Sequence, residues 1–188
     1  INIGALLAII VLITYNAWPA LTWEFLTEPP KSMMTEGGIW PCIVGTFFLA
    51  AGALVIALPL GVASAVYLNE YSNSASVWTT LTRLSIANLA GVPSIVFVLF
   101  CLTFFVVFCG LGVSLLSGIL TLAVLSLPII INTTEAALQQ VPQDWREASL
   151  ALGASKRETT MKVVLPNAMP GILTGAILAL ARAAGETA

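Results

Sequence analysis

The sequence predicts an all-α, polytopic membrane protein with five transmembrane helices, on the basis of two observations. Of the 188 residues, 59% are hydrophobic and only 9% are charged, whereas soluble domains carry about 25% charged residues. The charges are also unevenly spread. A helix crosses the hydrocarbon core with about 20 apolar residues, so each long charge-free run can span a bilayer. These runs are 1–23, 37–69, 84–134 and 163–181.

The run 84–134 is long enough to cross twice, and the turn-forming sequence "CGLGVS" at 109–114 divides it. No basic segment precedes the first apolar stretch, which argues against a signal peptide. Because the sequence begins without Met and stops inside an apolar helix, we expect 1–188 to be a single domain truncated at both ends. The predicted spans are 3–19, 40–66, 92–109, 115–134 and 168–188.

Lysine and arginine are distributed unequally between the connections, which predicts the orientation of the chain. Arg83 lies between spans two and three, and four more basic residues lie between spans four and five. Lys31 alone lies in a loop on the opposite side. The positive-inside rule therefore makes residues 67–91 and 135–167 cytoplasmic. The loop 22–38 is then extracytoplasmic.

The stretch 141–167 has the pattern of a helical hairpin, and its first helix has recognisable end signals. Asp144 followed by Glu147 has the spacing of a capping box, which predicts that Asp144 caps this helix. Gly153 supplies the left-handed residue that commonly follows a helix, so we expect the helix to end there.

A second short helix is expected directly after this glycine. Ser155 and Glu158 form another capping box, and Pro166 and Pro170 are expected to end the helix before the chain re-enters the membrane. Two short amphipathic helices would then project between two spans. Spacing alone favours an ordinary solvated loop with interfacial helices.

Several classes of function are excluded by what the composition lacks. There is no histidine, so no Ser/His/Asp constellation exists and the usual metal ligand is missing. No G-x-x-x-x-G-K-[ST] occurs, so the chain lacks the loop that holds ATP phosphates. Cys42, Cys101 and Cys109 have no CxxC spacing, and we expect them to be small packing residues rather than metal ligands or disulfides. We therefore expect neither an enzyme nor a bound metal or cofactor.

The hairpin sequence "EASLALGASKRETTMKVVLP" resembles the EAA loop of the permeases of ABC importers. That pattern is Glu-Ala-Ala, a glycine a few residues on, and Leu-Pro after the second helix; Ser149 replaces the second alanine here. The resemblance implies a type I importer fold with 141–167 as the coupling loop that docks on an ATPase subunit. The family has six spans, and the sixth is absent here. The coupling residues it implies are Glu147, Ala148, Gly153, Ala154, Leu165 and Pro166.

Other stretches narrow the resemblance to the phosphate permeases of this family. "VYLNEYS" at 66–72, "IANLAGVPSIVF" at 86–97 and "GILTGAILALARAAGETA" at 171–188 are similar to theirs. The Gly-Glu-Thr at 185–187 differs from the Gly-Glu-Phe usual in molybdate and sulfate permeases. "YLNEY", "NLAGVPSIV" and the alanine after Gly-Glu-Thr favour the A-type over the C-type subunit. The similarity covers most of 40–188.

Arg182 and Glu186 place two charges inside the last apolar segment. If that span begins near Pro170, Arg182 lies ~18 Å along it, near the middle of a core about 30 Å thick. Arginine at the centre of a span costs at least about 2.5–3.5 kcal/mol, so we expect Arg182 to face a cavity or a partner. Glu186 lies one turn further on the same helix face and can partly neutralise it.

These two residues are candidates for an anion pathway. A guanidinium can grip phosphate oxygens with two parallel bonds, and a nearby carboxylate would help the anion to leave. A structural ion pair that fixes packing against another subunit is the alternative. Several hydroxyl and amide side chains are further candidates for the polar lining. They are weaker candidates than Arg182, because such groups in membrane helices more often bond back to their own helix. They are Thr187, Ser94, Asn132, Thr133 and Thr134.

The family resemblance implies a subunit that forms half of a phosphate pathway in a bacterial plasma (inner) membrane. Its implied partners are two copies of an ATPase, which bind ATP and Mg, a C-type permease subunit and an extracytoplasmic phosphate-binding protein. The surroundings are lipid, and no nucleic acid is implied. A permease for another oxyanion, an ATP-independent anion transporter or channel, and a membrane scaffold that only recruits a soluble partner remain alternatives.

Overall fold

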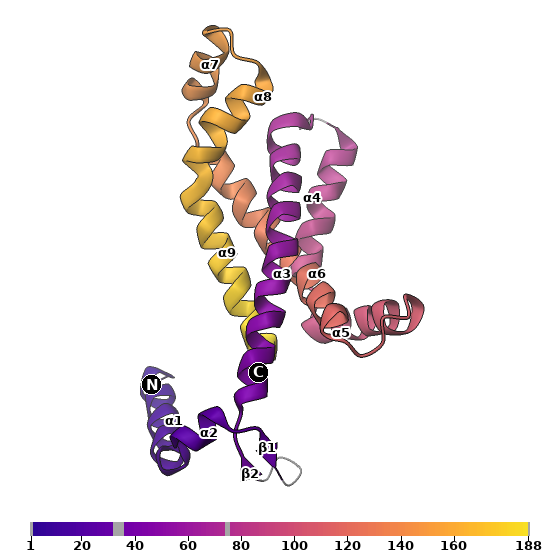
Figure 1. Ribbon diagram of the computed structural model, residues 1–188. Coiled ribbons are helices and arrows are strands. Elements are labelled where there is room, and N and C mark those ends of the chain that lie inside the picture. Colours follow the sequence, from indigo (N-terminus) through magenta and orange to yellow (C-terminus); the bar gives the residue numbers. More distant parts are fainter. Residues whose placement is uncertain (1, 32–35, 74–75, 188) are drawn as a thin grey trace. The chain divides into compact units, whose positions relative to one another are not determined.

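A computed structural model describes residues 2–31, 36–73 and 76–187 (Figure 1). The chain divides into two compact units, Ile1–Thr46 and Phe47–Ala188. The all-α class is confirmed, since helices make up most of the described chain and the two strands are two residues long each. The site candidates of the hairpin and of the last helix all lie in the second unit.

The first unit combines short helices with a small β-hairpin. Its elements are α1 (Asn2–Ala17), the 3₁₀-helix η1 (Trp18–Ala20), α2 (Trp23–Thr27), β1 (Pro30–Lys31), β2 (Glu36–Gly37) and the start of α3. Thr22 caps α2, because its hydroxyl accepts a hydrogen bond from the N–H of Phe25 at 3.2 Å. The two strands pair antiparallel, with Lys31 opposite Glu36.

The second unit is a bundle built from long apolar helices (Figure 1). Three segments are π-helical, which widens the helix locally. The elements in chain order are α3 (Trp40–Val66), η3 (Tyr67–Tyr71), α4 (Val77–Ala90), α5 (Ser94–Cys101), η4 (Leu102–Phe108), α6 (Leu115–Gln139), α7 (Gln143–Ala151), α8 (Lys156–Thr159), η5 (Thr160–Val164) and α9 (Leu165–Thr187).

Three helices of the described chain are long and apolar enough to cross a membrane, namely Trp40–Tyr71, Leu115–Gln139 and Lys156–Thr187. The pair formed by α4 and the helix Ser94–Phe108 is bent by 101° and adds a fourth crossing if it counts as one span. The sequence predicted five. The difference lies in α1, whose apolar part Gly4–Ala17 is shorter than a full crossing.

The expected third span, 92–109, differs from the structure at its start. A helix already begins at Val77, within the segment that we assigned to a cytoplasmic connection, and α4 packs along α6 (Figure 1). Arg83 interrupts the apolar run in the sequence, but in the fold it is paired with Glu135 of α6 at 2.7 Å. Charge-free runs therefore underestimate helices whose charges are paired inside the bundle. The same reason explains why α6 continues beyond 134 to Gln139.

The prediction that Pro166 and Pro170 end the second hairpin helix is wrong, because Lys156–Thr187 is one continuous helix. Proline removes one backbone donor, and membrane helices tolerate this where other groups bond the freed carbonyls. Next to Pro166, the side-chain amide of Asn167 donates to the Val163 carbonyl at 2.6 Å. The π-helical turn η5 directly precedes this point and widens the helix there.

Small residues allow α3, α6 and α9 to approach closely. A Cβ atom added at Gly61 of α3 would lie 2.6 Å from the Ile130 side chain of α6, and one added at Gly175 of α9 would overlap Thr133 of α6. Close backbone contact of this kind is typical of helix pairs in membranes. Of the three free cysteines, Cys101 is buried as expected of a packing residue, whereas the other two are exposed.

Candidate functional site

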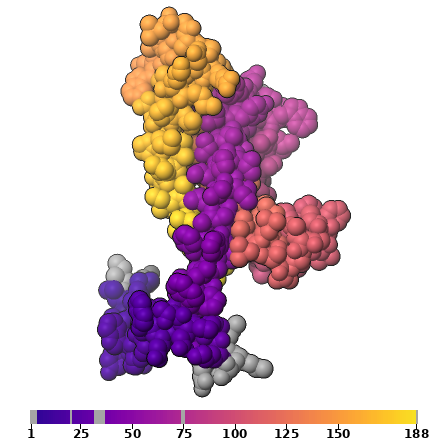
Figure 2. Space-filling model, viewed as in Figure 1, coloured from indigo at the N-terminus to yellow at the C-terminus, as the bar shows by residue number. Residues whose placement is uncertain are grey.

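The hairpin of α7 and α8 stands at one end of the second unit and is its outermost part there (Figures 1 and 2). Gly153 follows the end of α7 with φ +86°, a conformation that glycine adopts without the strain of a side chain. A hydroxyl contact of 2.9 Å between Ser149 and Thr159 joins the two helices. The predicted glycine-linked helical hairpin is confirmed.

The two predicted capping boxes have different outcomes. Ser155 accepts a hydrogen bond from the N–H of Glu158, whose carboxylate accepts one from the N–H of Ser155, so this box is confirmed. Asp144 is not the cap of α7. The helix begins at Gln143, before Asp144, and its N-cap is Pro142, which makes no side-chain hydrogen bond. Asp144 lies in the first turn instead, where a carboxylate still interacts favourably with the helix dipole.

The capping carboxylate of the second box titrates below the ordinary range. The backbone N–H of Ser155, then its hydroxyl and the charge of Lys162, hold the pKa of Glu158 below its ordinary value. Its charged form is therefore the one that the hairpin stabilises. The hairpin contributes this stability fully above the ordinary pKa and loses it as pH falls through the lowered one.

The residues implied by the EAA pattern are mostly accessible on this hairpin. Glu147, Ala148 and Gly153 are exposed, and so is Pro166 at the base of α9. Ala154 is half-buried. Leu165 is half-buried as well and packs against the core cluster of α3, α6 and α9. The tip can therefore meet a partner while its base is anchored in the bundle.

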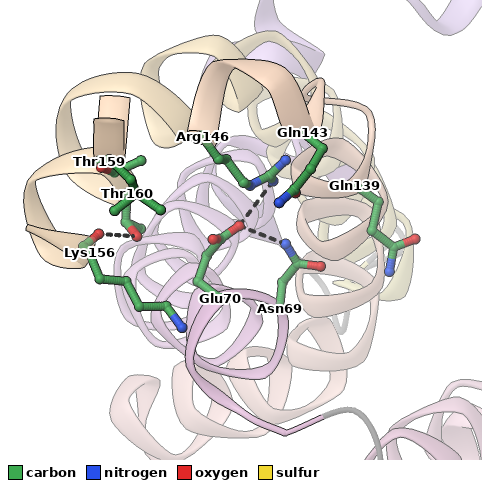
Figure 3. Close-up of a pocket in the computed structure, with 9 residues that line it drawn as sticks. Asn69, Glu70, Gln139, Gln143, Arg146, Lys156, Thr159 and Thr160 are labelled. Atoms are coloured by element: carbon green, nitrogen blue, oxygen red, sulfur yellow. Dashed lines mark hydrogen bonds and ion pairs between the residues drawn. The ribbon is translucent and has the colours of Figure 1, made fainter. Parts of the chain in front are cut away.

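A cavity of about 500 Å³ lies between the hairpin and the end of α3 (Figure 3). Its lining residues, other than Leu150, have polar side chains and come from η3, the end of α6, α7, α8 and the start of η5. On the α8 side, the ammonium group of Lys156 lies 5.5 Å from the ring centre of Tyr71 in η3, within cation–π range. The cavity thus brings residues 69 and 70 together with residues between 139 and 160, most of which belong to the predicted coupling loop.

The structure reveals a buried ion pair in this cavity that the sequence reasoning missed. Nη2 of Arg146 lies 3.0 Å from Oε1 of Glu70, and their side chains are only 13% and 9% exposed. Figure 3 shows the two side chains pointing toward each other across the cavity. One available signal was Glu70 itself, an isolated carboxylate at the end of a long charge-free run.

Arg182 and Glu186 lie four residues apart on α9, as predicted, and face each other loosely. Their closest atoms, Nε and Oε1, are 3.9 Å apart, and the side chains are 37% and 28% exposed. Because the helix is continuous from Lys156, its start does not mark where the chain enters the membrane. The depth of Arg182 in the bilayer and its role in a pathway stay predictions.

The weaker pathway candidates lie on three different helices, and Thr187 is the one that shares α9 with Arg182. Thr133 faces Gly175, which lies seven residues, ~10 Å of helix, before Arg182. Its hydroxyl donates to the carbonyl of Ile129 in its own helix, as we expected of such groups. The others are distributed as follows: Thr134 is fully buried, Asn132 is exposed, Ser94 begins α5, and Thr187 bonds back to Ala184.

Comparison with known proteins identifies the family. The family described as "Binding-protein-dependent transport system inner membrane component" matches residues 57–188. The probable ABC transporter permease protein YqgI of Bacillus subtilis (strain 168) is 39% identical over 176 residues, which are 94% of this chain and 60% of that protein. The phosphate transport system permease protein PstA 1 of Mycobacterium tuberculosis (strain ATCC 25618 / H37Rv) is 38% identical over 177 residues, 92% of this chain and 57% of that protein.

A solved structure supports the same fold. An inward-facing conformation of the MetNI methionine ABC transporter matches 79% of this chain and 68% of its own chain, with a TM-score of 0.62 and 28% identity. The chain spans about three-fifths of the length of the curated relatives that it matches. These findings agree with the apolar helices and with the EAA-like hairpin. The chain belongs to the family of inner membrane components of binding-protein-dependent transport systems, and within it is similar to the PstA phosphate permeases.

Proposed function

We propose that this chain is a membrane-spanning subunit of an ATP-driven phosphate importer and forms half of its translocation pathway. The observation that carries the proposal is the exposed, glycine-linked hairpin at the end of the bundle, on a chain similar to phosphate permeases. ATP hydrolysis belongs to a separate ATPase, because the sequence has no phosphate-binding loop. The hairpin is the docking element for that ATPase.

The complete importer in this proposal contains more than one polypeptide. Two copies of the ATPase bind ATP and Mg, a C-type permease completes the pathway, and an extracytoplasmic phosphate-binding protein delivers the anion. The family description itself refers to binding-protein-dependent transport. Arg182 binds the anion in the pathway with charge-assisted hydrogen bonds, and the negative charge of Glu186 limits the affinity so that the anion can leave.

The test is ATP-driven uptake of labelled phosphate, against sulfate, by the reconstituted complex with the native full-length chain. Arg182→Gln should lower phosphate uptake about tenfold or more, because each hydrogen bond to a charged group contributes about 1.5–3 kcal/mol. Glu186→Gln should slow turnover while phosphate binding is kept. Lys31→Gln, which removes the charge of a 57% exposed side chain outside both the hairpin and α9, is the matched control and should transport normally.

Three outcomes would contradict parts of this proposal. Normal uptake by Arg182→Gln would reduce Arg182 and Glu186 to a packing pair. Equal uptake of sulfate would assign the chain to another oxyanion class, and uptake without ATP would make it an ATP-independent transporter or channel. A hairpin that binds the ATPase in a complex without any transport would make the chain a scaffold.

A further inference from the structure

We infer that Glu70 and Arg146 form a positioning pair that makes the coupling hairpin and the end of α3 move as one body. The inference rests on the proposed function, since it concerns how movement at the hairpin reaches the membrane helices. Glu70 lies in η3, directly after α3, and Arg146 lies in α7. The two residues are far apart in sequence, so only the fold joins them.

Arg146 ties the hairpin to the ends of two membrane helices. Besides the ion pair with Glu70, its guanidinium donates to the carbonyl of Leu138 at 2.8 Å and to that of Val141 at 2.6 Å. Leu138 belongs to the last turn of α6. Arginine has a rigid planar set of donors, which fits several acceptors at once. One side chain of α7 is therefore bonded to the ends of α3 and α6 together.

The acceptor side of the pair is also held in place. The side-chain amide of Asn69 donates to Oε1 of Glu70 at 2.8 Å, the same oxygen that Arg146 contacts. Figure 3 shows both groups converging on this carboxylate. If Arg146 moved, the Glu70 side chain could not simply rotate to keep its contact, because the Asn69 amide holds the same oxygen. Movement of Arg146 would therefore be passed to the backbone of η3.

A second arginine, in α4, also bonds to η3. Arg83 of α4 donates to the carbonyl of Leu68 at 3.2 Å and pairs with Glu135 of α6 at 2.7 Å. The stretch 68–70 is thus bonded to α4 by Arg83 and to α7 by Arg146. It is also π-helical, and such local widening of a helix is frequent at functional sites.

The burial of the pair explains why it can transmit a displacement. Separating the two side chains, which are only 9% and 13% exposed, would leave Glu70 with the Asn69 amide alone and would take from Arg146 its carboxylate partner, which is unfavourable. Displacing the hairpin alone would require that separation. Displacing the hairpin together with the end of α3 keeps the pair intact. An ATPase that pulls on the exposed hairpin therefore moves α3 as well.

The test uses the reconstituted complex and two measurements. The first is the amount of phosphate transported per ATP hydrolysed. We expect Glu70→Gln and Arg146→Gln each to lower this ratio about tenfold with ATP hydrolysis changed less than about twofold. Arg146→Lys should lower it less, because the charge that pairs with Glu70 remains although lysine cannot reach the two carbonyls as well. The double variant should fall no further than either single one, because a pair already broken cannot be broken again.

The second measurement does not depend on transport. Spin labels at Leu152→Cys on the hairpin and Tyr67→Cys at the end of α3, with the native cysteines replaced, report the distance between the two segments; both positions are exposed, at 90% and 62%. Arg146→Gln should broaden the narrow wild-type distance distribution, and Lys162→Gln, the exposed control on the hairpin side, should not.

The outcomes separate this inference from the proposed function. Absence of ATP-driven phosphate uptake in the wild type would refute the proposed function. The distance distribution between the spin labels would still test whether Glu70 and Arg146 hold the two segments together. An unchanged distribution in Arg146→Gln would overturn the inference. So would a normal transport-to-ATP ratio in a working complex, because a pair that matters only for stability would lower transport and ATP hydrolysis together.

Discussion

At the scale of single residues, the ion pairs of this chain differ mainly in how far water reaches them. Lys162 and Glu158 are 75% and 51% exposed at 3.5 Å, a geometry that contributes little to stability. Glu70 and Arg146 are 9% and 13% exposed at 3.0 Å and are shielded from salt. A charge in so apolar a chain is therefore informative chiefly where it is buried.

The capping box of α8 gives a residue-scale prediction with a defined pH dependence. In full-length protein, carboxyl NMR should show Glu158 titrating below its ordinary pKa, because the N–H of Ser155 favours the charged form. Ser155→Ala should move the titration only part of the way back up, because it removes the hydroxyl bond and keeps the backbone N–H, and it should cost about 0.5–2 kcal/mol of local stability. Lowering pH through this titration should loosen the hairpin. An unshifted Glu158 in the wild type would contradict the capping box.

At the scale of elements, the bundle depends on glycines where helices meet. On α9, Gly171 faces Ala137 and Gly175 faces Thr133, so close approach to α6 repeats after one helical turn. Small residues also lie where α3 and α9 share a core cluster, with Ala53 and Ala57 from α3 and Ala179 from α9. Small side chains permit close van der Waals packing, which holds membrane helices together in the absence of a hydrophobic difference from lipid.

This packing predicts how glycine substitutions on α9 will differ. Gly175→Val should lower the stability of the purified chain by about 1–3 kcal/mol, because an added side chain overlaps Thr133. Gly185→Val is the matched control on the same helix, since no atom lies within 4 Å of its added Cβ. Thermal unfolding in detergent measures both. Equal melting temperatures for the two variants would contradict the contact between α6 and α9.

At the scale of the whole molecule, the hairpin and the turn 109–114 lie at the two ends of α6. Because α6 is long and apolar enough to cross the membrane, these two connections should lie on opposite sides. The basic residues assign the hairpin to the cytoplasm. Both connections offer exposed positions, with Leu152 at 90% and Val113 at 98%.

This topology predicts the labelling pattern of single cysteines. With the three native cysteines replaced, a membrane-impermeant maleimide should label Val113→Cys in right-side-out vesicles and Leu152→Cys in inside-out vesicles. Labelling of both from one side would show that α6 does not cross. The reverse pattern would show that the orientation taken from the charges is inverted.

Features that depend on local physics could be predicted from the sequence. The apolar runs place α3 and α6 correctly, because transfer into lipid depends on composition over about 20 residues. The turn at 109–114 and the hairpin with Gly153 follow from backbone preferences, and Gly110, Gly112 and Gly153 all have positive φ. The capping box of Ser155 is equally local.

The pairing of charges and the continuation of helices, in contrast, depend on the packing of the folded chain. Arg83 with Glu135, and Glu70 with Arg146, join residues 52 and 76 positions apart, and no spacing rule along one helix reaches that far. The helix continues through Pro166 and Pro170 although each proline lacks a backbone donor, and the Asn167 side chain adds a hydrogen bond to the Val163 carbonyl of the same helix. Partners supplied by packing, rather than local preference, thus decided the buried charges and helix ends of this protein.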